Sequence, residues 1–191
     1  MNKLPKGFTL VELLVVISII GILATIGLAA FTSAQMRSRD AARKSDLKQI
    51  ASALELFYSD YGYYPYLGSG SINNGKIPAC PFDPLKKTGT NCSWGTSGPA
   101  SEFYDGKTVY FMTLPKDPSS GYTYYYRTLD SGQKFQLYAH LENSQDINCL
   151  LNANTQKPDC TNPTLPTTSQ PNCGSGVCNF SITSANTSPT E

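Results

Sequence analysis

The N-terminal part of the chain contains the sequence KGFTLVE at residues 6–12 and continues as an apolar run to residue 31. Residues 13–31 are 19 consecutive residues without a charge. As a helix that rises about 1.5 Å per residue, this run would reach roughly 29 Å, about the thickness of the hydrocarbon core of a bilayer. Length and composition therefore predict a membrane-spanning helix.

A single carboxylate, Glu12, lies at the start of this helix. A charged side chain costs about 2.5–3.5 kcal/mol at the centre of a membrane helix on insertion scales, and somewhat less near an end. An isolated acid at this position therefore needs a partner or another purpose.

The KGFTLVE sequence closely resembles the leader and mature start of type IV pilins and of type II secretion pseudopilins. The resemblance implies that a prepilin peptidase cleaves the chain between Gly7 and Phe8 and methylates the new N-terminal amine of Phe8. It also implies that Glu12 pairs with the N-terminal amine of a neighbouring subunit during assembly. A generic signal anchor that tolerates one acid is the alternative.

The helical pattern continues beyond the apolar run, because residues 32–61 contain neither Pro nor Gly. Gly62 and Pro65 then end the helix after about fifty residues. An apolar stripe with spacings of three and four predicts burial of one face of its second half. The stripe consists of Leu47, Ile50, Ala51, Leu54, Phe57, Tyr58 and Tyr61.

These patterns predict an α+β fold in which a long N-terminal helix, with a membrane half and an amphipathic half, packs on a small antiparallel sheet with long disulfide-stapled loops. The pattern of residues 122–129 and 134–141 predicts a β-hairpin. One face of this hairpin is expected to pack on the helix and the other to face solvent. Residues 66–106 read as a long loop region. The expected parts are a cleaved leader at 1–7, a transmembrane or filament-core half-helix at 8–31, an amphipathic half-helix at 32–62, a head at 63–151 and an Asn/Thr/Pro/Ser-rich tail at 152–191.

Five basic residues lie between positions 37 and 48, together with Asp40 and Asp46. We interpret them as a solvated helix face, and binding of DNA or lipid headgroups is the alternative. The positive-inside rule alone would place this cluster in the cytoplasm, but the leader motif and the cysteines favour export. Removal of Lys3 and Lys6 lowers the count of basic side chains from 15 to 13 against 14 acidic ones, so net charge does not favour a nucleic-acid partner.

All six cysteines lie beyond the apolar helix. An even number in a charge-poor segment favours disulfides in an oxidising compartment. Six cysteines allow many pairings, and our expectation is nearest-neighbour pairing. Zinc binding is the alternative, with His140 as the chain's only histidine. The expected pairs are Cys80 with Cys92, Cys149 with Cys160, and Cys173 with Cys178.

The motif LPKDP at 114–118 and YGYYP at 61–65 are similar to those of major pseudopilins, in which a calcium ion often sits in the loops after the sheet. Acidic candidates for calcium are Asp117, Asp130, Glu142 and Asp146. Because no compact acidic ligand loop is present, we expect no cofactor and interpret these residues as solvated loop acids. His140 has no nucleophile partner in a catalytic pattern, so we do not expect an enzyme.

The expected function is that of a structural subunit of a type IV pilus, which serves adhesion, motility or DNA uptake. The alternatives are a pseudopilin of a type II secretion or competence machine and a pilus-mounted adhesin. Expected partners are further copies of the chain, the prepilin peptidase, and the assembly platform with its ATPase. The precursor would cross the cytoplasmic (inner) membrane once, before the mature protein joins an extracellular filament.

Overall fold

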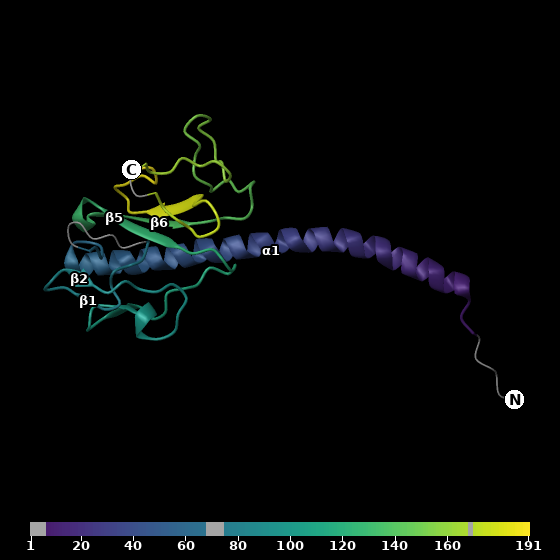
Figure 1. Ribbon diagram of the computed structural model, residues 1–191, viewed down its shortest axis with the longest axis horizontal. Coiled ribbons are helices and arrows are strands. Elements are labelled where there is room, and N and C mark those ends of the chain that lie inside the picture. The colour runs from purple at the N-terminus through teal and green to yellow at the C-terminus, as the bar shows by residue number, and fades with distance from the viewer. Residues whose placement is uncertain (1–6, 68–74, 168–169) are drawn as a thin grey trace. The chain divides into compact units, whose positions relative to one another are not determined.

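The computed structural model describes residues 7–67, 75–167 and 170–191. The chain divides into two compact units, Met1–Ser38 and Arg39–Glu191, and helix α1 (Leu10–Tyr61) contributes to both (Figure 1). Most of the leader expected at 1–7 lies outside the described residues. The observed fold has one long N-terminal helix and small antiparallel sheets, which confirms the α+β prediction.

In the first unit, α1 presents its apolar side chains to the surroundings on all sides. The large apolar side chains that the structure describes between Leu10 and Phe31 are exposed, with Leu10 at 80% and Leu28 at 70%. By length and composition the helix could cross a membrane. Apolar surface of this extent is costly in water, so a bilayer or other helices must cover it.

In the second unit, the remainder of α1 buries the predicted apolar stripe. Leu47, Ile50, Leu54 and Phe57 are fully buried, at spacings of three and four that keep them on one helix face. The helix ends where Gly62 adopts a φ of 73° and donates its N–H to the Tyr58 carbonyl oxygen at 2.7 Å. A glycine in this left-handed conformation is a common helix terminator.

The main sheet has the antiparallel order β5-β6-β7 (Tyr125–Leu129, Lys134–Ala139 and Phe180–Thr183). The predicted hairpin is confirmed: a turn at Asp130–Gly132 joins β5 to β6, and Tyr126 pairs with Leu137. Figure 1 shows β5 and β6 alongside the C-terminal part of α1. Phe135, Leu137 and Ala139 point into the core formed with the helix stripe.

The expectation that the outer face of this sheet meets solvent is wrong. Gln136 and Tyr138 are fully buried, because the end of the chain folds across them. The Tyr138 hydroxyl donates to the Pro189 carbonyl oxygen at 2.7 Å, and the Gln136 side-chain amide donates to the Ser188 carbonyl oxygen at 2.5 Å. The tail is likewise no simple surface extension, because residues 180–183 supply β7 and pair with β6.

The loop region before the sheet contains only two short hairpins and one 3₁₀ turn, in its described residues. The hairpins are β1 (Phe82–Asp83) with β2 (Thr88–Gly89), and β3 (Phe103–Tyr104) with β4 (Val109–Phe111), and the turn is Pro99–Ser101. The rings of Phe82, Phe103 and Tyr110 lie 5.1–5.5 Å from that of Phe57, so this region packs on the helix through aromatic contacts.

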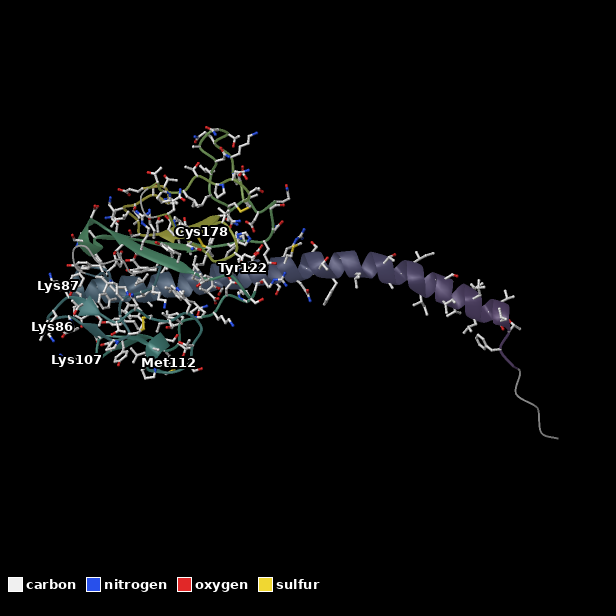
Figure 2. All side chains as sticks on the ribbon, viewed as in Figure 1. Lys86, Lys87, Lys107, Met112, Tyr122 and Cys178 are labelled. Atoms are coloured by element: carbon white, nitrogen blue, oxygen red, sulfur yellow. A yellow bond between two sulfur atoms is a disulfide. The ribbon has the colours of Figure 1, made fainter. Side chains whose placement is uncertain are left out.

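Three disulfides staple the second unit (Figure 2), and they join the nearest-neighbour pairs expected from the sequence. Each closes a short loop of 5–12 residues in sequence separation. In the chain-entropy view such cross-links stabilise by restricting the unfolded chain. The bonds are Cys80–Cys92, Cys149–Cys160 and Cys173–Cys178.

Candidate functional site

The N-terminal end of α1 is closed by a reciprocal pair of side chains, Thr9 and Glu12. The Thr9 hydroxyl accepts the Glu12 backbone N–H at 3.2 Å, while the Glu12 carboxylate accepts the Thr9 backbone N–H at 2.9 Å and the Thr9 hydroxyl at 2.6 Å. This arrangement is a capping box, which satisfies otherwise unpaired donors at a helix start. It fixes the first helical residue at Leu10.

The bond between Gly7 and Phe8 lies ahead of the capped helix. Gly7 has no neighbouring atom within 4 Å of the position that a side chain would occupy, and Phe8 is 76% exposed. Neither residue belongs to the helix. The bond at which the sequence predicts cleavage thus joins two exposed residues outside α1.

Both side-chain contacts of Glu12 with Thr9 use the same carboxylate oxygen, Oε2. Within the described part of the chain, Oε1 accepts no hydrogen bond and no cation pairs with the carboxylate. The cap thus orients the Glu12 side chain while one oxygen stays available. A carboxylate that can accept further donors suits an ammonium group from outside the chain.

The interpretation of the basic cluster as a solvated helix face is wrong for Arg43, because this side chain is fully buried. Its guanidinium forms a two-pronged pair with Asp117, with Nε and Nη2 each 2.8 Å from a carboxylate oxygen. It also lies 2.8 Å from Asp40 and 2.7 Å from Glu142. Burial alone would lower the pKa of Arg43, but the hydrogen bonds to Asp117 and Glu142 outweigh burial and raise it.

Two further helix cations extend this network to the loop after β6. Arg39 bonds both oxygens of Glu142, and this bond is the largest of the interactions that lower the pKa of Glu142 to about 2, with Ser119 and Arg43 contributing. Lys44 lies 2.5 Å from Asp146. Burial acts to raise the pKa of Asp146, but the bond from Lys44 contributes to a net lowering. Asp40 accepts the backbone N–H groups of Glu142 and Asn143 at 2.9 Å, so the helix also anchors the loop backbone.

The interpretation of the loop acids as solvated is therefore wrong for Asp117, which is 3% exposed and bound by Arg43. Glu142 and Asp146 face helix cations, and Asp130 pairs with Lys134 at 3.1 Å. Among the residues that the structure describes, no cluster of three or more acidic, histidine or cysteine side chains could hold a metal ion. The acids named as calcium candidates thus have cationic partners within the chain.

Sequence reasoning missed the capping role of Thr9, although the signal was present. Thr-x-x-Glu directly before an apolar run is the pattern of a capping box. Reasoning from sequence also treated Arg43 and Asp117 separately. Their pairing spans 74 residues, and no local pattern indicates it.

The structure defines a class of proteins in which an exposed Gly-Phe bond precedes a capped apolar helix, and the helix continues into a disulfide-stapled α+β head. The N-terminal segment of such a protein is suited to proteolytic processing. Comparison with known sequences supports this classification. Residues 2–28 match the family described as the prokaryotic N-terminal methylation motif. The type II secretion system core protein G of Pseudomonas aeruginosa is 32% identical over 138 residues, which cover 72% of this chain and 84% of that protein. The chain belongs to the family of type IV pilins and type II secretion pseudopilins.

Major pilins match over a shorter part of the chain. The type IV major pilin protein PilA of Myxococcus xanthus is 41% identical over 63 residues, 33% of this chain and 29% of PilA. The type IV major pilin protein PilE of Neisseria gonorrhoeae is 38% identical over 65 residues, 34% of this chain and 39% of PilE. The chain thus aligns with well under half the length of these two pilins. No solved structure matches it significantly.

Proposed function

We propose that the chain is a structural subunit of a type IV pilus. The observation that carries the proposal is the N-terminal segment, where an exposed Gly7–Phe8 bond precedes an apolar helix whose Glu12 is oriented by Thr9 and keeps one oxygen available. The precursor inserts α1 into the cytoplasmic membrane. Prepilin peptidase hydrolyses the Gly7–Phe8 bond and methylates the amine of Phe8.

The assembly platform and its ATPase then move the subunit from the membrane into a filament of identical chains. Neighbouring helices replace lipid around the exposed apolar residues of the first unit. The Phe8 ammonium of one subunit reaches Oε1 of Glu12 on the next. An ion pair buried in a low-dielectric core favours the register that forms it, because an unpaired charge there is costly. The resulting filament lies outside the cell and serves adhesion, motility or DNA uptake.

A second candidate is a pseudopilin of a type II secretion or competence machine, which would form a short periplasmic filament. The match to a secretion core protein over most of the chain favours it. A third is a pilus-mounted adhesin. Its recognition surface would lie in the tail and the long loop region.

Electron microscopy of cells tests the first candidate against the second. We expect long surface fibres that disappear when the chain is deleted and return when it is restored in trans. A deletion strain that keeps its fibres would contradict the pilus proposal. Loss of protein secretion with unchanged fibres would support the pseudopilin instead.

A further inference from the structure

A cleft of about 350 Å³ opens in the second unit, away from the N-terminal segment. Its walls are formed by the residues just before β5, the segment at the end of β6, and the segments at the Cys149–Cys160 and Cys173–Cys178 disulfides. Figure 2 labels Tyr122 and Cys178 on this part of the unit, and Tyr122 forms a β-bridge with Gly174. The lining includes Tyr122, His140, Glu142, Thr161, Ser175 and Val177.

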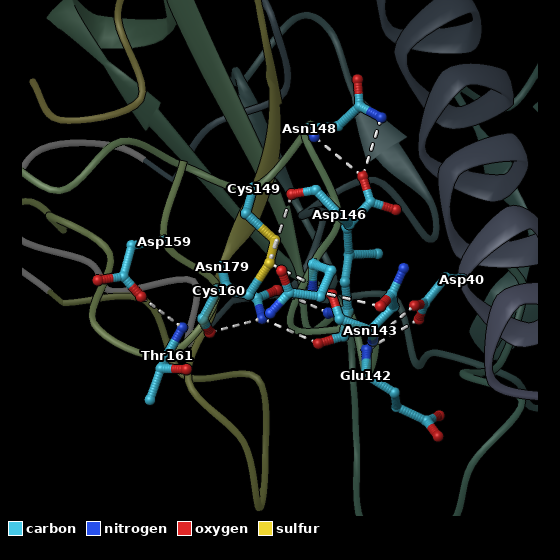
Figure 3. Close-up of a disulfide and its surroundings, with 12 residues drawn as sticks. Asp40, Glu142, Asn143, Asp146, Asn148, Cys149, Asp159, Cys160, Thr161 and Asn179 are labelled. Atoms are coloured by element: carbon cyan, nitrogen blue, oxygen red, sulfur yellow. Dashed lines mark hydrogen bonds between the residues drawn. A yellow bond between two sulfur atoms is a disulfide. The ribbon is translucent and has the colours of Figure 1, made fainter. Parts of the chain in front are cut away.

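The cleft is rigidly built. The Cys149–Cys160 and Cys173–Cys178 bonds each close one of the loops that form its walls. The buried Asn179 side chain donates to the carbonyl oxygens of Cys160 and Leu141, both at 2.9 Å, which ties the first loop to the strand end (Figure 3). A site that is formed before its ligand arrives loses little entropy on binding.

The second disulfide loop lies directly against an aromatic pair in the cleft wall. The rings of Tyr122 and His140 stack with centroids 4.7 Å apart and an interplanar angle of 4°. A side chain on Gly176 would come within 2.6 Å of both rings. Because any larger residue would clash with these rings, glycine at this position lets the loop backbone pack directly against the aromatic pair.

His140 lines the cleft and is held by one of its ring nitrogens. Its Nδ1 lies 2.7 Å from the Val177 carbonyl oxygen. Because a carbonyl oxygen only accepts, Nδ1 carries the proton of this contact. Nε2 has no hydrogen-bond partner within residues 7–67, 75–167 and 170–191.

The other polar side chains that line the cleft are hydroxyls and one carboxylate. The side chains of Ser144, Thr161 and Ser175 form no hydrogen bond with any residue that the structure describes, and all three residues are exposed. The one carboxylate, on Glu142, is bound by Arg39 and Arg43 and so brings no free charge. Each hydroxyl can both donate and accept.

We propose that this cleft binds a neutral sugar residue about the size of one hexose. Hydroxyls that donate and accept, beside the His140 ring and the apolar Val177, match the alternating polar and apolar surface of a sugar ring. The volume is at the lower end for small-molecule sites of roughly 300–1,000 Å³. The two cations beside the cleft, Arg39 and Arg43, are both paired with Glu142, so the described lining presents no free cation to a phosphate or another anion. The site is independent of filament formation and would give the head a recognition role.

The chain's only histidine makes the test direct, because one imidazole signal reports on the cleft. The full chain, purified in a detergent without sugar headgroups, is titrated with methyl glycosides of glucose, galactose, mannose and their N-acetylamino forms. We expect at least one glycoside to shift the His140 resonance saturably in the NMR spectrum. The absence of a saturable shift with every glycoside would overturn the proposal, as would saturation by inorganic phosphate.

Paired variants locate the binding. Thr161→Arg places a long cationic side chain at the cleft, whereas Thr113→Arg makes the same change at an exposed threonine outside it. We expect Thr161→Arg to abolish the glycoside-induced shift and Thr113→Arg to retain it, with Trp94 fluorescence confirming that both variants fold. Equal shifts in the two variants would place the sugar elsewhere and contradict the proposal.

Discussion

Replacing Arg43 by Ala lowers the free energy of unfolding of the second unit by about 3–5 kcal/mol, the usual effect of removing one partner of a buried ion pair. Arg43 has no exposed surface, and Asp117 has almost none. Without the guanidinium, Asp117 and Asp40 stay buried as carboxylates that have lost their cation. Uncompensated buried charge is among the largest destabilising effects of a single substitution.

Trp94, the chain's only tryptophan, reports the unfolding, because its ring lies 5.8 Å from that of the buried Tyr124. Denaturant titration of the full chain in detergent, followed by Trp94 fluorescence, gives the difference between variants. Lys48→Ala is the matched control, since Lys48 is an exposed cation on the same helix. We expect it to change stability by less than about 0.5 kcal/mol. Equal effects of the two substitutions would refute the role assigned to Arg43.

Replacing Glu12 by Gln reduces the filament yield at least tenfold and leaves cleavage at Gly7–Phe8 intact. Glutamine can still form the capping box with Thr9, so the helix start is kept. The amide has no charge, however, and cannot neutralise a neighbour's Phe8 ammonium in the filament core. The substitution therefore separates the charge of Glu12 from its capping role.

Sheared filaments and the cell-bound subunit are quantified from the same culture. Thr9→Val is the complementary variant, because it removes the hydroxyl half of the capping box and keeps the charge of Glu12. We expect Thr9→Val to assemble better than Glu12→Gln. Filament yields of Glu12→Gln equal to those of the unmodified chain would show that the ion pair is dispensable.

The elements that local sequence patterns specify were predictable. The apolar stripe of α1 and the hairpin around Asp130–Gly132 depend on residues close together in the chain, and both are present. The expected cleavage between Gly7 and Phe8 also rests on one short local motif, and it stays a prediction. The pairing of each cysteine with its neighbour in the sequence was predictable as well, because closing a short loop has the lowest entropic cost.

The features that depend on distant residues were not predictable. β7 comes from a polar tail, and only its pairing with β6 reveals Phe180–Thr183 as a strand. Arg43 looked like one member of a surface cluster because its partner Asp117 lies 74 residues away. The cleft around His140 combines four separate chain segments. Tertiary packing determines each of these, and periodicity carries no information about it.

Intact-mass spectrometry of the purified protein tests the central claim most directly. A subunit of the pilin family that is processed as proposed has lost residues 1–7 and carries one added methyl group on Phe8. We expect this single mass, and fragment ions should place the methyl group on the Phe8 amine. A full-length, unmethylated mass would contradict the account.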